Sequence, residues 1–344
     1  MIDQGFWKNR KVLITGHTGF KGSWLACYLN YLGSEVYGLS DSEIISENYE
    51  RIDKKKTFQS EYNLDISDNS NKLTKVFNQD FDFVFHLAAQ GVVSTAKIKP
   101  LETLVTNIIG TFNVMNLVNE NEKINGLVIS TTDKVYSDTA NSNLEESSLG
   151  GKEFYSSSKA STEHIISAFI NTISRKNLNI GVVRSGNVLG GGDGGKDRIV
   201  TDIINSLKNN EDIYLRNPES IRPWQYILDS LNGYLMTGEY CVKNNQNEIF
   251  NLGSSENNEK KVMDLTENIL KNWNSDKNIE IKQKQNLFYE SEFLRIDSKK
   301  ANNILGWQPL FDLEMISTAI VDWYKSDSDE ITIDQIDEFH KISS

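Results

Sequence analysis

The chain has 344 residues, 38% of them hydrophobic, and a formal net charge of −12. This length and hydrophobic content can bury a sizeable core, so we expect one large domain or two domains in close contact, and we exclude a disordered chain. Because no long run of Lys and Arg offsets the negative charge, the composition argues against a nucleic-acid-binding protein and against binding to anionic membranes.

The cysteines and histidines give no sign of a disulfide framework or a metal site. Cys27 and Cys241 lie far apart, and the four histidines are scattered, so we predict no bound metal. Residues 1–10 contain no apolar stretch of signal-peptide length, and no run of about 18 apolar residues occurs. We therefore expect a cytoplasmic protein that does not cross a membrane.

Short apolar runs alternate with longer segments of helical period in the first half of the chain. The strand-like runs are KVLITG (11–16), EVYGLS (35–40), DFVFHLA (82–88), GLVIST (126–131) and IGVVRSG (180–186). Helical segments such as Lys21–Leu32 and Pro100–Asn119 separate them. Apolar strands that alternate with helices are typical of a parallel sheet covered on both faces, so we predict an α/β fold with a Rossmann-type doubly wound sheet.

The first strand is followed by the glycine-rich stretch GHTGFKG (16–22) and then by a helix. In this arrangement Gly16 permits a tight turn, Gly19 lets backbone amides approach a pyrophosphate, and Gly22 lets the helix pack closely. The spacing G-x-x-G-x-x-G differs from the more common G-x-G-x-x-G, and a plain turn is the alternative. The context of strand, turn and helix favours a dinucleotide site.

Acidic residues after the second and third strands are candidates to bind the rest of a dinucleotide. Asp41 lies about 20 residues beyond Gly22, the spacing at which a carboxylate binds a ribose hydroxyl, which favours NAD over its 2′-phosphorylated form. The alternative is that Asp41 only begins a loop, since Ser40 and Asp41 are good turn residues. Further on, Asp65 is a candidate for the adenine end, whereas Asp68 fits a helix cap.

A possible catalytic set lies around the fifth strand. Tyr155 and Lys159 are four residues apart and share one helical face, so the ammonium would lower the pKa of the phenol and make Tyr155 a base near neutral pH. Lys159 could also hold the nicotinamide ribose. Such a pair alone also fits a solvated helix face, but Thr132 at the end of the preceding strand supplies a hydroxyl for the same substrate oxygen.

The alternating pattern loosens after about residue 185. A glycine-rich loop, GNVLGGGDGGKD, precedes shorter strand-like runs in DIYLRN, EIFNLGS and IEIKQK. We therefore divide the chain into a dinucleotide-binding domain (1–185), a smaller α/β substrate-binding lobe from which the chain crosses back (186–326), and an acidic tail (327–344). For the tail, weak order and a docking helix both remain open.

These features resemble the extended short-chain dehydrogenase/reductase family, and within it the nucleotide-sugar 4,6-dehydratases that act on CDP-glucose. The resemblance covers nearly the whole chain, in FWKNRKVLITGHTGFKGSWL, FHLAAQ, TNIIGT, STTDKVY, YSSSKA, RSGNVLGGGD, LRNPESIRPWQYILDSLNGYL, NLGSSEN and LGWQP. The motifs GNVLGGGD and RNPESIRPWQ separate this group from other members of the superfamily.

The resemblance implies a bound NAD that is reduced and reoxidised in each turnover. Tyr155 would take the proton of the 4-hydroxyl of the hexose, and Asp133, in its acid form, would assist loss of the 6-hydroxyl as water. Lys134 stands where related dTDP-glucose enzymes carry a glutamate base. As a neutral amine it could be the base, or it could orient Asp133 or stabilise an enolate, and a surface lysine is the plainest alternative.

The resemblance also implies two sets of binding residues. The expected NAD-binding residues are Gly16, Thr18, Gly19, Phe20, Lys21, Gly22, Asp41, Asp65, Ile66, Leu87, Ala88, Ala89, Thr106, Tyr155 and Lys159. The expected nucleotide-sugar contacts are Gln90, Asn107, Asn187, Arg198, Arg216, Arg222 and Trp224. The arginines suit a diphosphate because their planar guanidinium groups match phosphate oxygens.

Simpler explanations remain open for some of these positions. Trp224 also fits a core aromatic residue, Arg222 an exposed cation, and Asn107 an amide on a helix surface. The segment from Leu87 to Ala89 also fits plain strand packing.

Two segments depart from the family pattern. Ser94 and Lys97 stand where the family has Arg and Tyr, and the stretch VYSDTANSNLEESSLGGKEF after Lys134 is short and lacks the usual tryptophans. Both segments would border the hexose pocket, so another nucleotide or hexose remains open. An epimerase or reductase on the same scaffold and a non-catalytic NAD-binding sensor are the alternative functions.

The resemblance further implies a homodimer formed through helices near residues 100–120 and 155–175, and it leaves a dimer of dimers open. The product would supply deoxysugars for a bacterial surface polysaccharide such as lipopolysaccharide.

Overall fold

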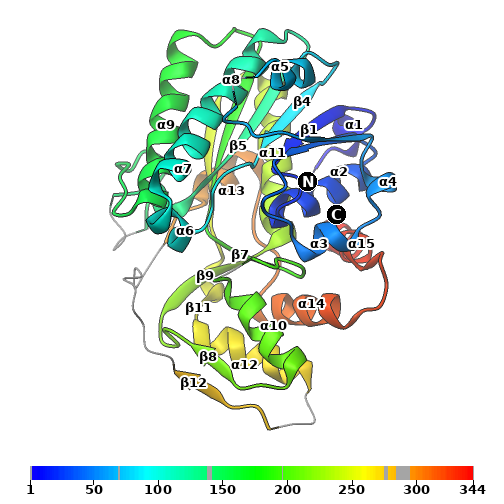
Figure 1. Cartoon of the computed structure of the whole chain (residues 1–344), viewed down its shortest axis with the longest axis vertical. Coiled ribbons are helices and arrows are strands. Elements are labelled where there is room, and N and C mark those ends of the chain that lie inside the picture. Colours follow the sequence, from blue (N-terminus) through cyan, green and yellow to red (C-terminus); the bar gives the residue numbers. More distant parts are fainter. Residues whose placement is uncertain are drawn as a thin grey trace.

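The computed structural model describes residues 2–68, 70–137, 142–195, 197–274, 278–283 and 295–343. Part of the short segment after Lys134, residues 138–141, lies outside the described residues, as do Lys196 of the glycine-rich loop and the last residue of IEIKQK. Figure 1 shows a larger body built on one sheet and a smaller body beside it that contains β8, β9, β11, β12, α10 and α12.

The larger body contains a seven-stranded parallel sheet in the order β10-β6-β5-β4-β1-β2-β3. Its strands are β1 (Lys11–Thr15), β2 (Glu35–Ser40), β3 (Ser60–Asn63), β4 (Phe83–His86), β5 (Gly126–Thr132), β6 (Asn179–Ser185) and β10 (Glu248–Leu252). The order reverses between β1 and β4, as in doubly wound dinucleotide-binding folds. The predicted α/β class with a doubly wound parallel sheet is confirmed.

Helices cover both faces of this sheet, which explains why its central strands are apolar along their whole length. The first half of the chain contains α1 (Gln4–Trp7), α2 (Phe20–Tyr31), α3 (Glu47–Arg51), α4 (Lys54–Thr57), α5 (Asn71–Phe77), α6 (Val93–Ile98), α7 (Pro100–Leu104), η1 (Val105–Gly110), α8 (Thr111–Glu120), η2 (Asp133–Val135) and α9 (Phe154–Thr172). One core lies between the sheet and α5, α8 and α9, and the other between the sheet and α2 and α11 (Figure 1).

The predicted helix Pro100–Asn119 is divided into three parts. Its middle, η1, is one turn of π-helix between α7 and α8. A Cβ on Gly110 at the end of η1 would lie 2.7 Å from the side chain of Ile66, so the helix packs closely on the loop after β3. Such widened turns occur often at functional sites, and η1 carries Thr106 and Asn107.

The second half of the chain contributes to both bodies. Its elements are β7 (Asn187–Leu189), α10 (Ile199–Asn209), β8 (Ile213–Leu215), β9 (Ile221–Tyr226), α11 (Ile227–Asn244), η3 (Glu256–Asn258), β11 (Glu259–Lys261), α12 (Val262–Trp273), β12 (Ile281–Gln283), α13 (Lys299–Leu305), α14 (Leu313–Lys325) and α15 (Ile331–Ser343). A three-stranded sheet has the order β11-β9-β7, and β8 pairs with β12. The chain then returns to the large sheet through α11 and β10.

The acidic C-terminal segment contains a docked helix. Helix α15 packs against α2, and its residues Ile336 and Phe339 are buried in the larger core. Within the described parts of the chain, no helix combines the length and apolarity needed to cross a membrane.

Candidate active site

The glycine-rich turn between β1 and α2 is built so that side chains would not fit. Gly16 has φ +77°, and a Cβ there would lie 2.7 Å from the backbone nitrogen of Ala88. A Cβ on Gly22 would lie 2.1 Å from the carbonyl oxygen of Gly16. Helix α2 begins after Gly19 without a side-chain cap, so the N–H groups of its first turn can bind an anion. The turn therefore fits the pyrophosphate of a dinucleotide.

The two aspartates expected at the adenosine lie at the carboxyl ends of neighbouring strands. Asp41 follows β2, is exposed and accepts a hydrogen bond from the backbone N–H of Glu43 at 3.1 Å. Asp65 follows β3 and accepts hydrogen bonds from the backbone N–H and the hydroxyl of Ser67, both at 2.8 Å. Each carboxylate thus shapes its own turn, and each lies where a doubly wound sheet binds the adenosine half of a dinucleotide.

Other expected cofactor residues support the loops around the turn. The hydroxyl of Thr18 donates to the carbonyl of Ile44 at 2.7 Å and so holds the loop after β2, while Ile66 is buried. Lys21 does not face the glycine turn: its ammonium donates to Ser185 Oγ at 2.7 Å and to the Tyr234 hydroxyl at 3.3 Å. Lys21 therefore joins α2 to the carboxyl end of β6 and to α11.

The segment after β4 runs beside the turn and is fixed by one buried amide. Leu87, Ala88 and Ala89 of this segment are partly buried. Another expected cofactor residue, Phe20 on α2, has its ring near Gly190. Asn107 is fully buried on η1. Its Nδ2 donates to Gln90 O at 3.1 Å and to Ser158 Oγ at 2.8 Å, and its Oδ1 accepts from Gln90 N at 2.8 Å.

This geometry excludes one explanation that the sequence left open for Asn107, because the residue is buried and does not lie on a helix surface. Its polar atoms bind protein groups and hold the loop after β4, and its contact with a substrate stays a prediction. The side chain of Gln90 likewise closes a turn on Val92, with hydrogen bonds of 2.9 and 3.2 Å. Thr106 lies beside Asn107 on η1 and is partly buried.

The expected catalytic residues of β5 and η2 meet at the carboxyl end of β5. The hydroxyl of Thr132 donates to Asp133 Oδ1 at 3.0 Å, and Lys134 Nζ lies 3.8 Å from the same oxygen. Asp133 is 3% exposed, and its other oxygen, Oδ2, has no hydrogen-bond partner among the described residues. A Cβ on Gly186 would lie 2.9 Å from Oδ2, so Gly186 leaves room for this carboxyl group.

Helix α9 brings Tyr155 and Lys159 to the same place. Glu153 caps the helix through the N–H groups of Tyr155 and Ser156, and Lys159 Nζ donates to the carbonyl of Ser130 at 2.8 Å. Burial lowers the pKa of Lys159 to about 8; the charge of Glu163 opposes this change and that of Lys21 adds to it.

Tyr155 corrects an expectation from the sequence. Burial raises the pKa of Tyr155 to about 12, and the groups that lower it most are the Thr132 hydroxyl and the Arg198 charge. The expected phenolate near neutral pH, produced by Lys159, is therefore wrong for the protein by itself, because burial outweighs the favourable neighbours. The same interactions place Thr132, Tyr155 and Arg198 in one site.

The residues expected at the nucleotide sugar divide into a group at the site and a group in the core. Arg198 is the N-cap residue of α10, and its Nε lies 3.9 Å from Asp193 Oδ2. Arg216 is paired with Asp197, whose other oxygen accepts a hydrogen bond from Ser94 at 2.7 Å. One of the two departures from the family pattern, Ser94, is thus linked to an expected phosphate ligand. The amide nitrogen of Asn187 on β7 is buried and lacks a hydrogen-bond partner within the described ranges.

Trp224 and Arg222 lie on the central strand of the small sheet. Trp224 is 3% exposed within the larger core, and its indole N–H donates to Lys260 O at 3.1 Å. Trp224 is therefore a core aromatic residue, the simpler explanation that the sequence left open. Arg222 is also buried and donates to the carbonyl of Ile221 at 2.9 Å, which excludes the exposed cation.

The sequence analysis missed several polar groups under the site. His86 lies between the hydroxyls of Thr15 and Thr111, at 2.7 and 2.9 Å, and burial lowers its pKa to about 3. The hydroxyls of Ser130 and Tyr234 are 2.7 Å apart. The hydroxyl-rich strand ends STT and RSG were the available signal, but their partners come from distant segments.

Comparison with known proteins places this chain among the nucleotide-sugar dehydratases and epimerases of the extended short-chain dehydrogenase/reductase class. The GDP-mannose 4,6 dehydratase family model matches residues 13–319, and the chain belongs to that family. It is 34% identical over 337 residues to a CDP-glucose 4,6-dehydratase of Salmonella typhimurium, over 95% of this chain and 93% of that protein. A dTDP-glucose 4,6-dehydratase of the same organism is 25% identical over 342 residues, covering 91% of this chain and 92% of that protein.

Solved structures show the same fold. A dTDP-glucose 4,6-dehydratase of Bacillus anthracis in complex with NAD superposes with a TM-score of 0.76 at 22% identity, over 93% of this chain and 97% of that one. A UDP-glucose 4-epimerase of Stenotrophomonas maltophila with bound NAD has a TM-score of 0.78 at 18% identity, over 92% and 98%.

Proposed function

We propose that the protein catalyses the NAD-dependent dehydration of CDP-D-glucose to CDP-4-dehydro-6-deoxy-D-glucose and water. The identity to a CDP-glucose 4,6-dehydratase is higher than that to the dTDP-glucose enzyme of the same organism, which supports the nucleotide. One observation supports dehydration as the reaction type. The buried carboxyl group of Asp133, with one oxygen unpartnered among the described residues, lies beside Thr132 at the site of Tyr155.

The cofactor site fits NAD because Gly16 and Gly22 shape a turn that aims open N–H groups of α2 at an anion, with Asp41 at the end of β2. Bound NAD would accept a hydride from carbon 4 of the hexose and return it to carbon 6. The protein supplies the proton transfers. For this step Tyr155 must first lose its own proton, which the positive charges of Arg198 and of bound NAD would favour. As the phenolate, Tyr155 takes the proton of the 4-hydroxyl as the 4-ketone forms, and Thr132 hydrogen-bonds the same oxygen.

Elimination needs two further groups, one at each of the neighbouring carbons 5 and 6. The ketone acidifies the hydrogen on carbon 5, and Lys134 is assigned to this position, either as the base that takes the proton or as a cation that stabilises the enolate. Asp133, as the acid, donates its proton to the 6-hydroxyl, so the carbon–oxygen bond breaks and water leaves. The separation of 3.8 Å between Lys134 Nζ and Asp133 Oδ1 lets the two groups act on adjacent carbons. Return of a hydride to carbon 6 and of a proton to carbon 5 completes the product.

The diphosphate of the substrate is assigned to Arg198 and Arg216. Both side chains are partly exposed, and Arg198 lies close enough to lower the pKa of Tyr155. Their guanidinium groups can bind phosphate oxygens through paired hydrogen bonds.

The test is incubation with NAD and CDP-glucose in deuterated water, followed by mass spectrometry and NMR, with dTDP-, UDP- and GDP-hexoses in parallel. The expected product is a 4-keto-6-deoxy sugar that carries deuterium at carbon 5. A stereoisomer of unchanged formula would instead identify an epimerase, and NAD binding without turnover of any nucleotide sugar would identify a sensor. Tyr155→Phe should abolish turnover and retain NAD. Asp133→Asn should accumulate reduced nicotinamide without losing water.

We also assign a second copy of this chain as the partner of the helical face formed by α7, η1, α8 and α9. Large apolar side chains exposed on these packed elements are Leu101, Val105, Ile109, Phe112 and Ile165. Light scattering should show a dimer that Ile109→Glu converts to a monomer, whereas Ile342→Glu, at an exposed isoleucine of α15, should leave it intact. A monomeric unmodified protein would reject this assignment.

A further inference from the structure

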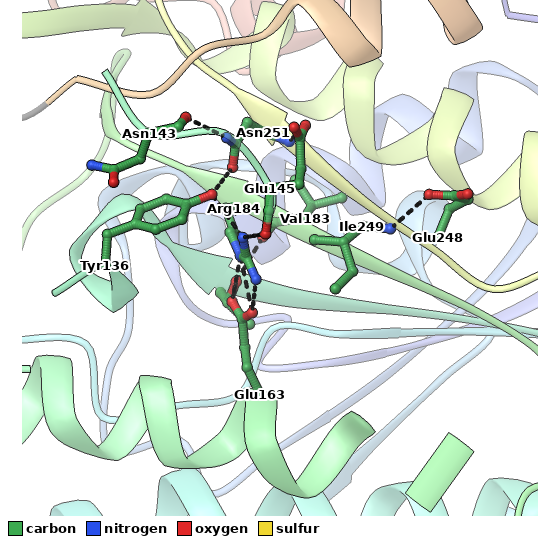
Figure 2. Close-up of polar contacts among 10 residues, drawn as sticks. Tyr136, Asn143, Glu145, Glu163, Val183, Arg184, Glu248, Ile249 and Asn251 are labelled. Atoms are coloured by element: carbon green, nitrogen blue, oxygen red, sulfur yellow. Dashed lines mark hydrogen bonds and ion pairs between the residues drawn. The ribbon is translucent and has the colours of Figure 1, made fainter. Parts of the chain in front are cut away.

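A buried ion pair lies directly beneath the candidate active site. Arg184 on β6 is 2% exposed and Glu163 on α9 is 4% exposed. Arg184 Nε donates to both carboxylate oxygens of Glu163 at 2.9 Å, and Nη2 donates to one of them (Figure 2). Because Tyr155, Lys159 and Glu163 follow one another at intervals of four residues, all three lie on one face of α9.

The carboxylate of Glu163 also reaches the strand that carries the acid. Its Oε1 accepts a hydrogen bond from the Thr131 hydroxyl at 2.7 Å. Thr131 directly precedes Thr132, which hydrogen-bonds Asp133. Together with the hydrogen bond from Lys159 to Ser130 O, this contact fixes α9 against two successive residues near the end of β5, Ser130 and Thr131.

The guanidinium of Arg184 holds the segment that follows Asp133 and Lys134. Its Nη1 donates to the Tyr136 hydroxyl at 2.7 Å and to the carbonyl of Glu145 at 2.8 Å. Tyr136 in turn donates to Asn251 Oδ1 at 2.6 Å, and the backbone N–H of Asn251 donates to Glu145 Oε1 at 2.8 Å (Figure 2). Arg184 therefore connects α9 to Tyr136 and Glu145 in the segment after η2, and through Tyr136 to β10.

We infer that Arg184 and Glu163 are a positioning pair for the proposed reaction. They hold Tyr155 and Lys159 on α9 at a fixed place relative to Thr132, Asp133 and Lys134. This inference rests on the proposed function. Neither residue acts on the substrate itself; the pair fixes the distance between the groups that oxidise carbon 4 and those that expel the 6-hydroxyl. A misplacement of about 1 Å between such groups can lower a rate on the order of 100-fold.

Stability alone is a weak reason for this pair, because a buried ion pair is often replaceable by apolar side chains without loss of stability. The carboxylate of Glu163 also acts on the charge of Lys159, which a residue with a packing role alone would not do. The groups facing Lys159 are Glu163 and Tyr155 from its own helix, Lys21 from α2 and His86 from β4. Glu163 is the carboxylate among them that raises the pKa of Lys159, so its removal should lower that pKa further.

The experiment compares Glu163→Gln with a matched control, Glu248→Gln. Glu248 begins β10 and pairs with Lys300 at 2.5 Å, away from the carboxyl end of the sheet. Glu163→Gln should lower kcat on the order of 100-fold and leave KM within about threefold. Calorimetric titration with NAD across pH should show a transition near pH 8 in the unmodified protein, and that transition should move to lower pH in Glu163→Gln only.

The NAD titration keeps the two proposals distinguishable. If the unmodified protein turns over no nucleotide sugar, the proposed function fails, whereas the pH transition of NAD affinity still tests the ion pair. A lower melting temperature in Glu163→Gln with kcat and the pH transition unchanged would overturn the inference. If Glu163→Gln does not fold, Thr131→Val removes one contact of the same carboxylate; a lower kcat at unchanged KM supports the inference, and an unchanged kcat rejects it.

Discussion

The chain has two glycine-rich segments, GHTGFKG at residues 16–22 and GGGDGG at residues 190–195, and their glycines face different neighbours. In the first segment Gly16 and Gly22 face backbone atoms, and their turn exposes the N–H groups of α2. In the second segment a Cβ on Gly191 would lie 2.1 Å from the ring of Trp323, and one on Gly192, whose φ is +76°, would lie 2.7 Å from the nitrogen of Asn48. We assign the first segment to the proposed dinucleotide site, whereas the second lets distant helices meet.

Asn48 shows how the second segment is held. It is fully buried, its N–H donates to Gly192 O at 3.0 Å, and its amide donates to Ser23 Oγ at 3.0 Å and accepts from Thr332 Oγ1 at 2.5 Å. Trp24 of α2 donates to Gly191 O at 3.0 Å. The loop that leads to Arg198 is therefore attached directly to α2 and α3, and through Asn48 to α15. The two segments are thus rich in glycine for different reasons. In the first, glycines let backbone atoms of the turn approach closely, and in the second they leave room for Trp323 and Asn48.

The largest effect is expected from Gly22→Ala. The new methyl group would clash with the carbonyl of Gly16, and a backbone atom cannot move away as a side chain could. We expect a loss of about 3 kcal/mol in the free energy of unfolding and NAD affinity reduced by at least about 100-fold. Urea unfolding and calorimetry measure the two quantities. Unchanged NAD affinity would mean that the first segment is a plain turn.

Gly191→Ala tests the second segment, where the clash is with the Trp323 ring. We expect a destabilisation of about 2 kcal/mol with NAD affinity changed less than about twofold. A double-mutant cycle with Trp323→Leu should recover about 1 kcal/mol, because the two groups are in contact. A large loss of NAD affinity in Gly191→Ala would erase the distinction between the segments.

Arg216→Gln tests the assignment of Arg216 to the diphosphate of the substrate. Arg216 pairs with Asp197, just beyond the second segment, and loss of a charge-assisted bond to phosphate costs about 1.5 kcal/mol. We therefore expect KM for the nucleotide sugar to rise about tenfold, with kcat and NAD affinity unchanged. Steady-state kinetics with both substrates measure this, and a fall in kcat alone would contradict the assignment to the diphosphate.

The smallest effects concern pH, and they have opposite signs at Lys159 of the candidate active site and at Asp193 of the second glycine-rich segment. Lys159 has its pKa lowered from 10.5 to about 8, so the folded protein binds fewer protons than the unfolded chain between these values, and stability rises with pH there. Burial raises the pKa of Asp193 above 3.8, so stability falls as pH rises through the acid window between the unfolded and folded values.

Urea unfolding at a series of pH values compares the unmodified protein with Lys159→Met and Asp193→Asn. The first variant should lose the alkaline rise, and the second should lose the fall in the acid range. If a variant shows the same change of unfolding free energy with pH as the unmodified protein, the shifted pKa of the replaced residue is rejected.

The sequence predicted those features whose cause is local. Apolar runs located five strands of the large sheet, and the glycine spacing located the turn before α2. The run EIFNLGS, expected in the smaller lobe, instead forms β10 of the large sheet. The sequence left two roles open for Trp224, because the neighbouring strands β7 and β11 have three residues each and are too short to show a period. The hydrogen bonds of Asn107 with Gln90 and Ser158 join segments far apart in the chain. The ion pair between Glu163 and Arg184 does the same. The pKa of Tyr155 depends on burial by such segments, so spacing to Lys159 gave the wrong direction.

The central claim is that one active site removes a hydride from carbon 4 of the hexose and delivers it to carbon 6. The most direct measurement uses CDP-glucose deuterated at carbon 4 and locates the label in the product by NMR and mass spectrometry. Our account predicts a 4-keto-6-deoxy product with the deuterium on carbon 6. Deuterium retained on carbon 4, or a dehydrated product without the label, would contradict it.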